Sequence, residues 1–280
     1  LETGGIASLV EKETGRELVD KACPWPLNTY IYEQPEGGRK AVDDMTKRAK
    51  FNRWTPDAKV EMIAGDWNGP VARAFLVKSA PRMCRELQQR IVLYDDIKRI
   101  DLVNVLDKEE TFDPEAVYFA FPFKVDGGPP TATKERPSPS GKGGQEGLSP
   151  KGTVPLSKGD VPFGVRFEIS DADMAPGVEQ LPGTTLDWHT VQNWVEFVGR
   201  DARVVWSPVE APLVEFGDIN TGKWLKKLDV SNSRLYSYAM NNYWMTNFKA
   251  SQEGRVEFRY SLTSFPAGLP GPDRVASSRF

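Results

Sequence analysis

The chain contains one histidine, His189, and two cysteines, Cys23 and Cys84. A metal site needs several His, Cys or carboxylate ligands close together. Asp187 and His189 are on the same side of an extended segment, but two ligands are too few for a zinc centre. A single histidine gives equally weak support to a Ser-His-Asp or Cys-His catalytic site. We therefore expect His189 to be structural or solvent-facing, and we nominate no catalytic residue and no metal ligand.

Adjacent acidic residues occur at 43–44, 95–96 and 109–110. Two carboxylates about 5 to 10 Å apart can divide the roles of acid, base and nucleophile in glycoside hydrolysis. Neighbouring residues in a strand, however, point to opposite faces of the sheet. These pairs therefore indicate solvated charge at strand ends rather than a catalytic pair.

Tryptophans crowd the second half of the chain, at Trp188, Trp194, Trp206, Trp224 and Trp244. A sugar ring stacks its C–H face on an aromatic ring, while Asn and Asp side chains bond its hydroxyls. We expect most of these rings to lie in a hydrophobic core. Trp188 and Trp244 are the tryptophans that we expect to be exposed on a contact surface.

The stretch 234–262 contains the elements that position these groups. Its last part alternates with period two, so that Val256, Phe258, Tyr260 and Leu262 point to one side of a strand. The preceding residues mix amides and large rings too irregularly for one buried face, which predicts a segment that is half core and half contact surface. The candidate substrate or domain contacts are Trp188, Asn241, Asn242, Tyr243, Trp244 and Asn247.

Period-two runs recur along the rest of the chain, separated by Gly, Pro or Asp. They cover 5–10, 16–19, 28–33, 71–78, 88–94, 98–106, 115–123, 163–169, 191–198, 203–206 and 212–216. Residues 43–49 are the one predicted helix, and Pro122 predicts an edge position or a bulge for the strand that contains it. Short strands with such punctuation are typical of a large antiparallel β-sandwich, so we predict an all-β fold.

Glycine, proline, serine and lysine dominate residues 126–160, without apolar periodicity. This composition predicts a flexible linker or insertion. The chain is therefore expected to consist of a first part of the β-sandwich (1–125), this linker (126–160) and a second part of the β-sandwich (161–280).

The composition excludes several classes of protein. The formal net charge of −3 arises from 36 basic and 39 acidic residues that are interspersed. This is not the charge pattern of a protein that binds nucleic acid or an anionic membrane. No run approaches the roughly 18 apolar residues of a membrane helix, and no signal peptide is evident. We therefore expect a soluble chain.

Residues 1–19, LETGGIASLVEKETGRELV, resemble the opening of the β region in bacterial α-mannosidase-like glycoside hydrolases of family 38. Segments 93–101, 115–123, 181–183, 217–219 and 238–260 resemble later parts of that region, in the same order. The run Asn-Asn-Tyr-Trp-x-Thr-Asn-Phe at 241–248 is the most specific part of the likeness, which covers nearly the whole chain except the linker.

The resemblance implies the large sandwich that follows the catalytic domain in these enzymes, similar to galactose mutarotase-like sandwiches. The parent reaction would be retaining hydrolysis of terminal α-mannosides through a covalent glycosyl-enzyme. The nucleophile and the zinc ligands would belong to an N-terminal catalytic domain of the same chain, so this stretch alone is expected to be inactive and free of zinc. Its contact residues would face that domain and line the mannoside pocket.

Two other functions remain open. A free-standing carbohydrate-binding module would carry an exposed, coplanar tryptophan or tyrosine platform. A mutarotase-like epimerase would need a general acid and base, commonly His and Glu, facing one pocket. The lone His189 makes the epimerase the weaker of these two alternatives.

Overall fold

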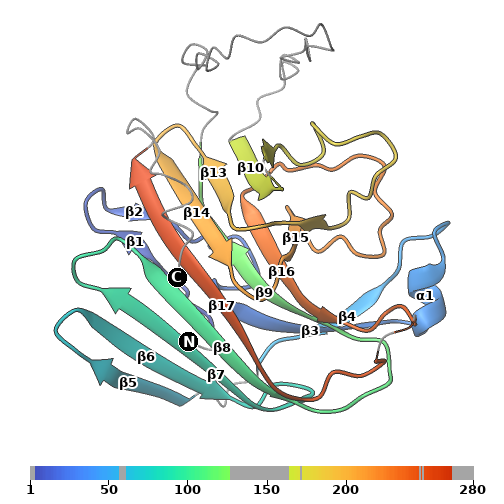
Figure 1. The fold of residues 1–280 in the computed structure, drawn as a ribbon, viewed down its shortest axis with the longest axis horizontal. Helices are drawn as coiled ribbons and strands as arrows, with labels where there is room; N and C mark the ends of the chain where they lie inside the picture. The colour runs from blue at the N-terminus through green and yellow to red at the C-terminus, as the bar shows by residue number, and fades with distance from the viewer. Residues whose placement is uncertain are drawn as a thin grey trace, which may run out of the picture.

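The protein is an antiparallel β-sandwich, as the sequence predicts. The computed structural model describes residues 4–56, 61–126, 164–170, 172–245, 247 and 249–266, without the side chains of 61–66. Two large sheets face each other (Figure 1), and every strand pair in them is antiparallel. A small two-stranded sheet of β1 (Val10–Glu11) and β2 (Arg16–Glu17) pairs the first two predicted runs, 5–10 and 16–19, as a hairpin.

The larger sheet has nine strands in the order β11-β10-β13-β14-β17-β8-β7-β6-β5. Its strands are β5 (Glu61–Asn68), β6 (Ala72–Ser79), β7 (Cys84–Tyr94), β8 (Ile100–Lys108), β10 (Gly164–Ile169), β11 (Ala172–Met174), β13 (Val195–Val198), β14 (Ala202–Pro208) and β17 (Gly254–Pro266).

The smaller sheet has six strands in the order β12-β15-β16-β9-β3-β4. Its strands are β3 (Thr29–Pro35), β4 (Phe51–Trp54), β9 (Ala116–Pro122), β12 (His189–Thr190), β15 (Leu213–Phe216) and β16 (Arg234–Asn241).

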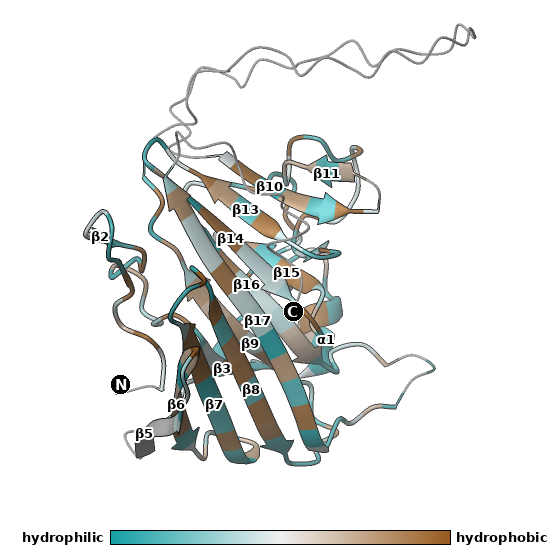
Figure 2. Ribbon diagram, turned by 60° about the vertical axis from the view of Figure 1, so that its left-hand side comes forward, coloured by the Kyte–Doolittle hydropathy of each residue, from teal (hydrophilic) through white to brown (hydrophobic). Residues whose placement is uncertain are grey.

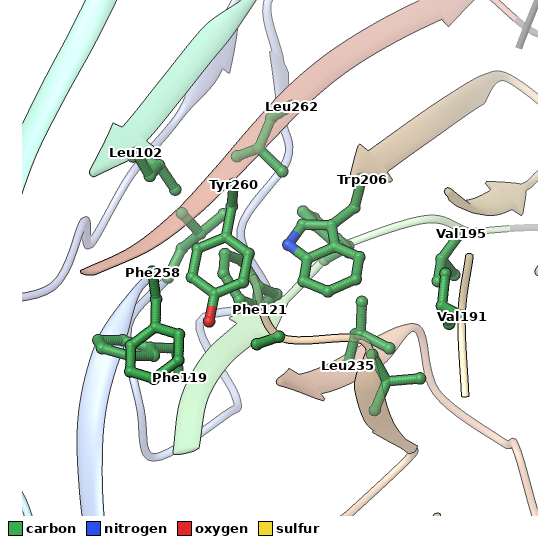
Figure 3. Close-up of a cluster of buried hydrophobic side chains, with 14 of the residues drawn as sticks. Leu102, Phe119, Phe121, Val191, Val195, Trp206, Leu235, Phe258, Tyr260 and Leu262 are labelled. Atoms are coloured by element: carbon green, nitrogen blue, oxygen red, sulfur yellow. The ribbon is translucent and has the colours of Figure 1, made fainter. Parts of the chain in front are cut away.

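Strand β17 is the central strand of the larger sheet. It pairs with β14 on one side and with β8 on the other, and so joins the strands β10 to β14 of this sheet to the strands β5 to β8. The predicted alternation is confirmed: Phe258, Tyr260 and Leu262 are buried and face the smaller sheet. Figure 3 shows Tyr260 in one cluster with Phe121 of β9 and Trp206 of β14. The centroid of the Tyr260 ring is 4.9 Å from that of Phe121 and 5.4 Å from that of Trp206. These aromatic contacts bind the two sheets into one core.

Strand β9 is buried on both faces, which corrects the prediction of an edge position or bulge at Pro122. The strand lies between β16 and β3, and Pro122 is its last residue, where the loss of a backbone N–H costs least. Phe119 and Phe121 point into the main core, whereas Tyr118 and Ala120 belong to a second apolar cluster on the outer face of the smaller sheet.

The predicted helix at 43–49 is wrong in position. The helix of this region, α1, spans Arg39–Asp43. The side chain of Asp44 accepts hydrogen bonds from the backbone N–H and hydroxyl of Thr46, and this turn ends the helix where the sequence pattern placed its start. Strands β4, β5, β11 and β16 were not predicted. The predicted strand 191–198 is confirmed only for its second half, β13, and β12 precedes it.

Both large sheets combine strands from the two parts of the chain on either side of 127–163. The predicted linker 126–160 lies outside the described residues, apart from Asp126. The hydropathy colouring in Figure 2 follows the sandwich, with brown bands along the strands between more polar connections. Within the described residues, no helix is long and apolar enough to cross a membrane.

Candidate functional site

The predicted contact residues lie at one end of the smaller sheet, but their exposure differs. Asn242 and Tyr243 are buried, with exposed fractions of 5% and 0%. Trp188, Asn241 and Trp244 are half-buried, and Asn247 is exposed. A buried side chain contacts another molecule only after local rearrangement. The contact role therefore stays a prediction for the four residues that solvent reaches.

Asn242 links two connections through its side chain. Its Oδ1 accepts the backbone N–H of Glu115 at 2.7 Å, and its Nδ2 donates to the backbone oxygens of Asp113 and Ala250 at 3.0 Å each. The residue thus replaces a strand ladder at the point where β16 ends, and it satisfies buried backbone groups of the β8–β9 and β16–β17 connections.

Arg39 of α1 also bonds the backbone of the β8–β9 and β16–β17 connections. Its Nη1 donates to the backbone oxygens of Asn242 and Tyr243, and its Nη2 donates to that of Phe112 at 3.4 Å. Figure 1 shows the connection between β16 and β17 beside α1. These bonds bring Phe112 close to the predicted segment, with 66% of its surface exposed.

Tyr243 is tied to a buried ion pair. Its hydroxyl donates to Glu33 Oε1 at 2.6 Å, and Arg53 Nε donates to Glu33 Oε2, also at 2.6 Å. Burial raises the pKa of Glu33, while the nearby Arg53 lowers it and favours the ionised form. Tyr243 therefore has a structural role, since its hydroxyl completes the hydrogen bonding of a buried carboxylate.

Trp188 and Trp244 pack against each other, although they are 56 positions apart in the sequence. Their ring centroids are 5.4 Å apart and their planes are inclined by 49°. The rings therefore do not form the coplanar platform expected of a free-standing carbohydrate-binding module. Met245 follows Trp244 and is 70% exposed, so the apolar surface continues beyond the pair.

Glu215 fixes a second connection over the outer face of the smaller sheet. Its carboxylate accepts the backbone N–H groups of Asn220 and Thr221 and the hydroxyl of Thr221. Burial raises the pKa of Glu215 to about 8, against the effect of these hydrogen-bond donors. Sequence reasoning missed Glu33, Arg39 and Glu215. The sequence did contain a signal for the two glutamates, because each is the one carboxylate in an otherwise mainly apolar strand, and such a residue is expected to be buried with a partner.

His189 and Asp187 are both structural. His189 is buried, its Nε2 is 2.8 Å from Gln180 Oε1, and burial lowers its pKa to about 4. The carboxylate of Asp187 accepts the backbone N–H groups of Trp224 and Leu225. Within the described part of the chain, no three His, Cys, Asp or Glu residues gather to hold a metal ion, so these residues do not fit a zinc centre. Cys23 and Cys84 are both buried and unpaired.

A cleft of about 500 Å³ opens where β16 ends and β17 begins. Its lining includes Asn241, one of the predicted contact residues, together with polar residues of the β16–β17 connection. The end of the smaller sheet thus combines an apolar surface around Trp244 with a polar cleft beside Asn241.

No family model and no curated protein matches the sequence. Two solved structures share the fold with a TM-score of 0.52 each, an alpha-mannosidase from Enterococcus faecalis V583 and a glycosyl hydrolase family 38 protein from Enterococcus faecalis. Sequence identity is 9% in both cases. The similarity covers 95% of this chain but 28% and 29% of those chains, so the chain spans less than a third of their length.

Proposed function

We propose that this chain is the non-catalytic β-sandwich part of an α-mannosidase-like glycoside hydrolase of family 38. The fold match supports this proposal, because it covers 95% of the chain and falls within one part of a much longer alpha-mannosidase. The resemblance of residues 1–19 and 241–248 to the same family supports it independently of the fold.

In this proposal the sandwich packs against an N-terminal catalytic domain of the same polypeptide. That domain would carry the carboxylate pair of a retaining mechanism and the zinc ligands. The exposed side chains of Phe112 and Met245 and the half-buried Trp244 support such packing, because they lie on connections that Asn242 and Arg39 hold in place. Rigid aromatic and aliphatic side chains of this kind are the usual anchors of a protein interface.

The coding sequence on the N-terminal side of Leu1 tests the proposal directly. We expect it to encode a βα-rich domain with a His-x-Asp metal motif. The longer polypeptide is expected to hydrolyse p-nitrophenyl α-D-mannopyranoside and to lose this activity with a zinc chelator, whereas residues 1–280 alone are expected to be inactive. An unrelated upstream domain, or hydrolysis by residues 1–280 alone, would exclude the proposal.

Substitutions at the exposed surface test where the catalytic domain packs. In the longer polypeptide, Trp244→Ala combined with Met245→Ser is expected to lower kcat/KM by about tenfold or more, because the loss of about 1.4 kcal/mol in positioning gives that factor. Ile97→Ser is the matched control, because Ile97 is also exposed, at 59%. Ile97 lies just before the first residue of β8, whereas the proposed interface lies near its last residue, Lys108. Equal effects of both changes would place the interface elsewhere.

A further inference from the structure

The cleft at the end of β16 is lined by both polar and apolar residues. Its lining residues are Met240, Asn241, Lys249, Ser251, Gln252, Glu253 and Val256. Met240 is buried and Val256 is half-buried, and both pack with the main core. The polar residues line the rest of the cleft. Its volume of about 500 Å³ lies within the usual range of about 300 to 1,000 Å³ for small-molecule sites.

Two amide side chains in this cleft are free to bond a ligand. Asn241 is half-buried and Gln252 is exposed, and neither side chain has a hydrogen-bond partner among the described residues. Each amide offers two N–H donors and one carbonyl acceptor. A hydroxyl group both donates and accepts, so a pair of unpartnered amides suits a ligand with several hydroxyls.

The two charged side chains in the cleft, Lys249 and Glu253, have opposite charges that sum to zero. Lys249 and Glu253 form an ion pair, and Ser251 donates to Glu253 Oε2 at 2.9 Å. The hydrogen bonds from Lys249 and Ser251 lower the pKa of Glu253, which keeps its carboxylate an acceptor. One positive and one negative group give no preference for a charged ligand, while both add strong hydrogen-bonding atoms.

The wall of the cleft is held in place by bonds outside it. Asn242 Nδ2 donates to the backbone oxygen of Ala250, which lies between Lys249 and Ser251. Gly254 then turns the chain into β17 with a φ of 96°, a conformation that side chains with a Cβ rarely adopt. The backbone beside Lys249 and Ser251 is therefore tied to Asn242, and such tethering reduces the entropy lost on binding.

We propose that this cleft binds a neutral, hydroxyl-rich ligand of the pyranoside class, with Asn241, Lys249, Gln252 and Glu253 bonding its hydroxyls. Met240 and Val256 receive the C–H face of the ring. The ligand class follows from the cleft, whereas the choice of a mannoside as the first probe rests on the proposed function.

The test uses residues 1–280 and two probes, methyl α-D-mannopyranoside and an α-linked mannobiose. Amide resonances of Asn241, Lys249 and Gln252 are expected to shift on titration, with a dissociation constant in the range of about 1 mM. Gln252→Ala and Lys249→Ala are each expected to weaken binding by about tenfold, since a hydrogen bond to a sugar hydroxyl is lost. Ile97→Ser is the control, because Ile97 is exposed and lies outside the cleft, and it is expected to leave binding unchanged.

Three results would overturn the proposal: no shifts with either probe, shifts confined to Trp188 and Trp244, or binding that survives both cleft substitutions. Gln252 and Lys249 are exposed, so the variants are expected to keep the dispersed spectrum of the folded chain. Failure here leaves the upstream catalytic domain and the hydrolysis assay unaffected. Conversely, an unrelated upstream domain would not change the binding measured with residues 1–280.

Discussion

Two neighbouring asparagines at the end of β16 show that residue type alone does not determine role. Asn242 is buried and bonds the backbone of two connections, whereas Asn241 is half-buried and its side chain has no partner among the described residues. Both are amides with the same hydrogen-bonding groups. Their positions relative to the sheet decide that one is structural and the other is free to contact a ligand.

Asn242→Ala is expected to destabilise the chain by about 2 to 3 kcal/mol, because it leaves buried backbone groups such as the Glu115 N–H without a partner. Asn241→Ala is the matched control and is expected to change the free energy of unfolding by about 0.5 kcal/mol or less. Urea denaturation measures both. Equal effects of the two changes would contradict the structural role of Asn242.

Glu215 predicts a dependence of stability on pH. Its folded pKa is about 8, because burial disfavours the charged form, whereas its ordinary value is 4.5. Between these pH values the folded chain keeps a proton that the unfolded chain releases. The contribution of this carboxyl to the free energy of unfolding is therefore greatest below pH 4.5 and falls as the pH rises towards 8.

Glu215→Gln removes this titration. The free energy of unfolding of the variant, relative to the wild type, is expected to rise steadily across the window between those two pKa values. Urea denaturation at a series of pH values measures the difference. Parallel pH profiles for the two proteins would show that Glu215 is already ionised in the folded state.

At the scale of elements, the β1–β2 hairpin depends on one buried carboxylate. Glu11 Oε1 accepts hydrogen bonds from Lys98 at 2.6 Å and from Ser264 at 2.9 Å. Although burial raises its pKa, the hydrogen bonds from Lys98, Thr14 and Ser264 lower it to about 2. A two-residue ladder is too short to hold a hairpin on its own, so Glu11 attaches it to β17 and to the β7–β8 connection.

Glu11→Gln is expected to loosen this hairpin and to accelerate tryptic cleavage after Lys12 and Arg16 by about tenfold, because a buried charged hydrogen bond is lost. Glu13→Gln is the matched control, since Glu13 bonds the same Lys98 but is 64% exposed. Mass spectrometry of the digest locates the cleavage sites. Equal acceleration by both changes would contradict the anchoring role of Glu11.

The Glu11 carboxylate also predicts a loss of stability in acid. Its contribution is fully present above the ordinary pKa of 4.5 and is lost as the pH falls towards about 2. Below that window the wild type and Glu11→Gln are expected to converge in their free energy of unfolding. A difference that persists unchanged at the acid end would assign the effect to packing instead of charge.

At the scale of the whole molecule, the two parts of the chain form one sandwich. The backbone oxygen of Asp126 accepts the N–H of Arg200 at 3.1 Å, and Gly164 pairs with Val198. The described residues on either side of 127–163 are therefore anchored on the same β13–β14 hairpin. Both parts contribute strands to both large sheets, so neither has a complete core alone.

Replacing residues 129–160 with a short Gly/Ser loop is expected to leave a single cooperative thermal transition. The Tm is expected to stay within about 3 °C, because each halving of loop length changes the closure cost by about 0.6 kcal/mol. Circular dichroism during heating measures it. A broad or two-step transition would show that the replaced residues contribute to the core.

The sequence by itself determined the all-β class and the inward face of β17, because alternation of side chains with period two is a local property of an extended chain. The contact segment was also predicted locally, from its mixture of amides and rings, and its contact role stays a prediction. The run 115–123 located β9, but the expectation of an edge or a bulge at Pro122 was wrong, because the order that places β9 between β16 and β3 is not a local property.

Only the tertiary structure decided which polar groups are buried and what they bond. Arg39 and Asn242 are 203 positions apart in the sequence, and Glu33 and Tyr243 are 210 apart, yet each pair forms a hydrogen bond. Such partners depend on strand order and register, which place distant residues side by side. For the same physical reason, the packing of the sheets separated the structural Asn242 and Tyr243 from the accessible Asn241 and Trp244.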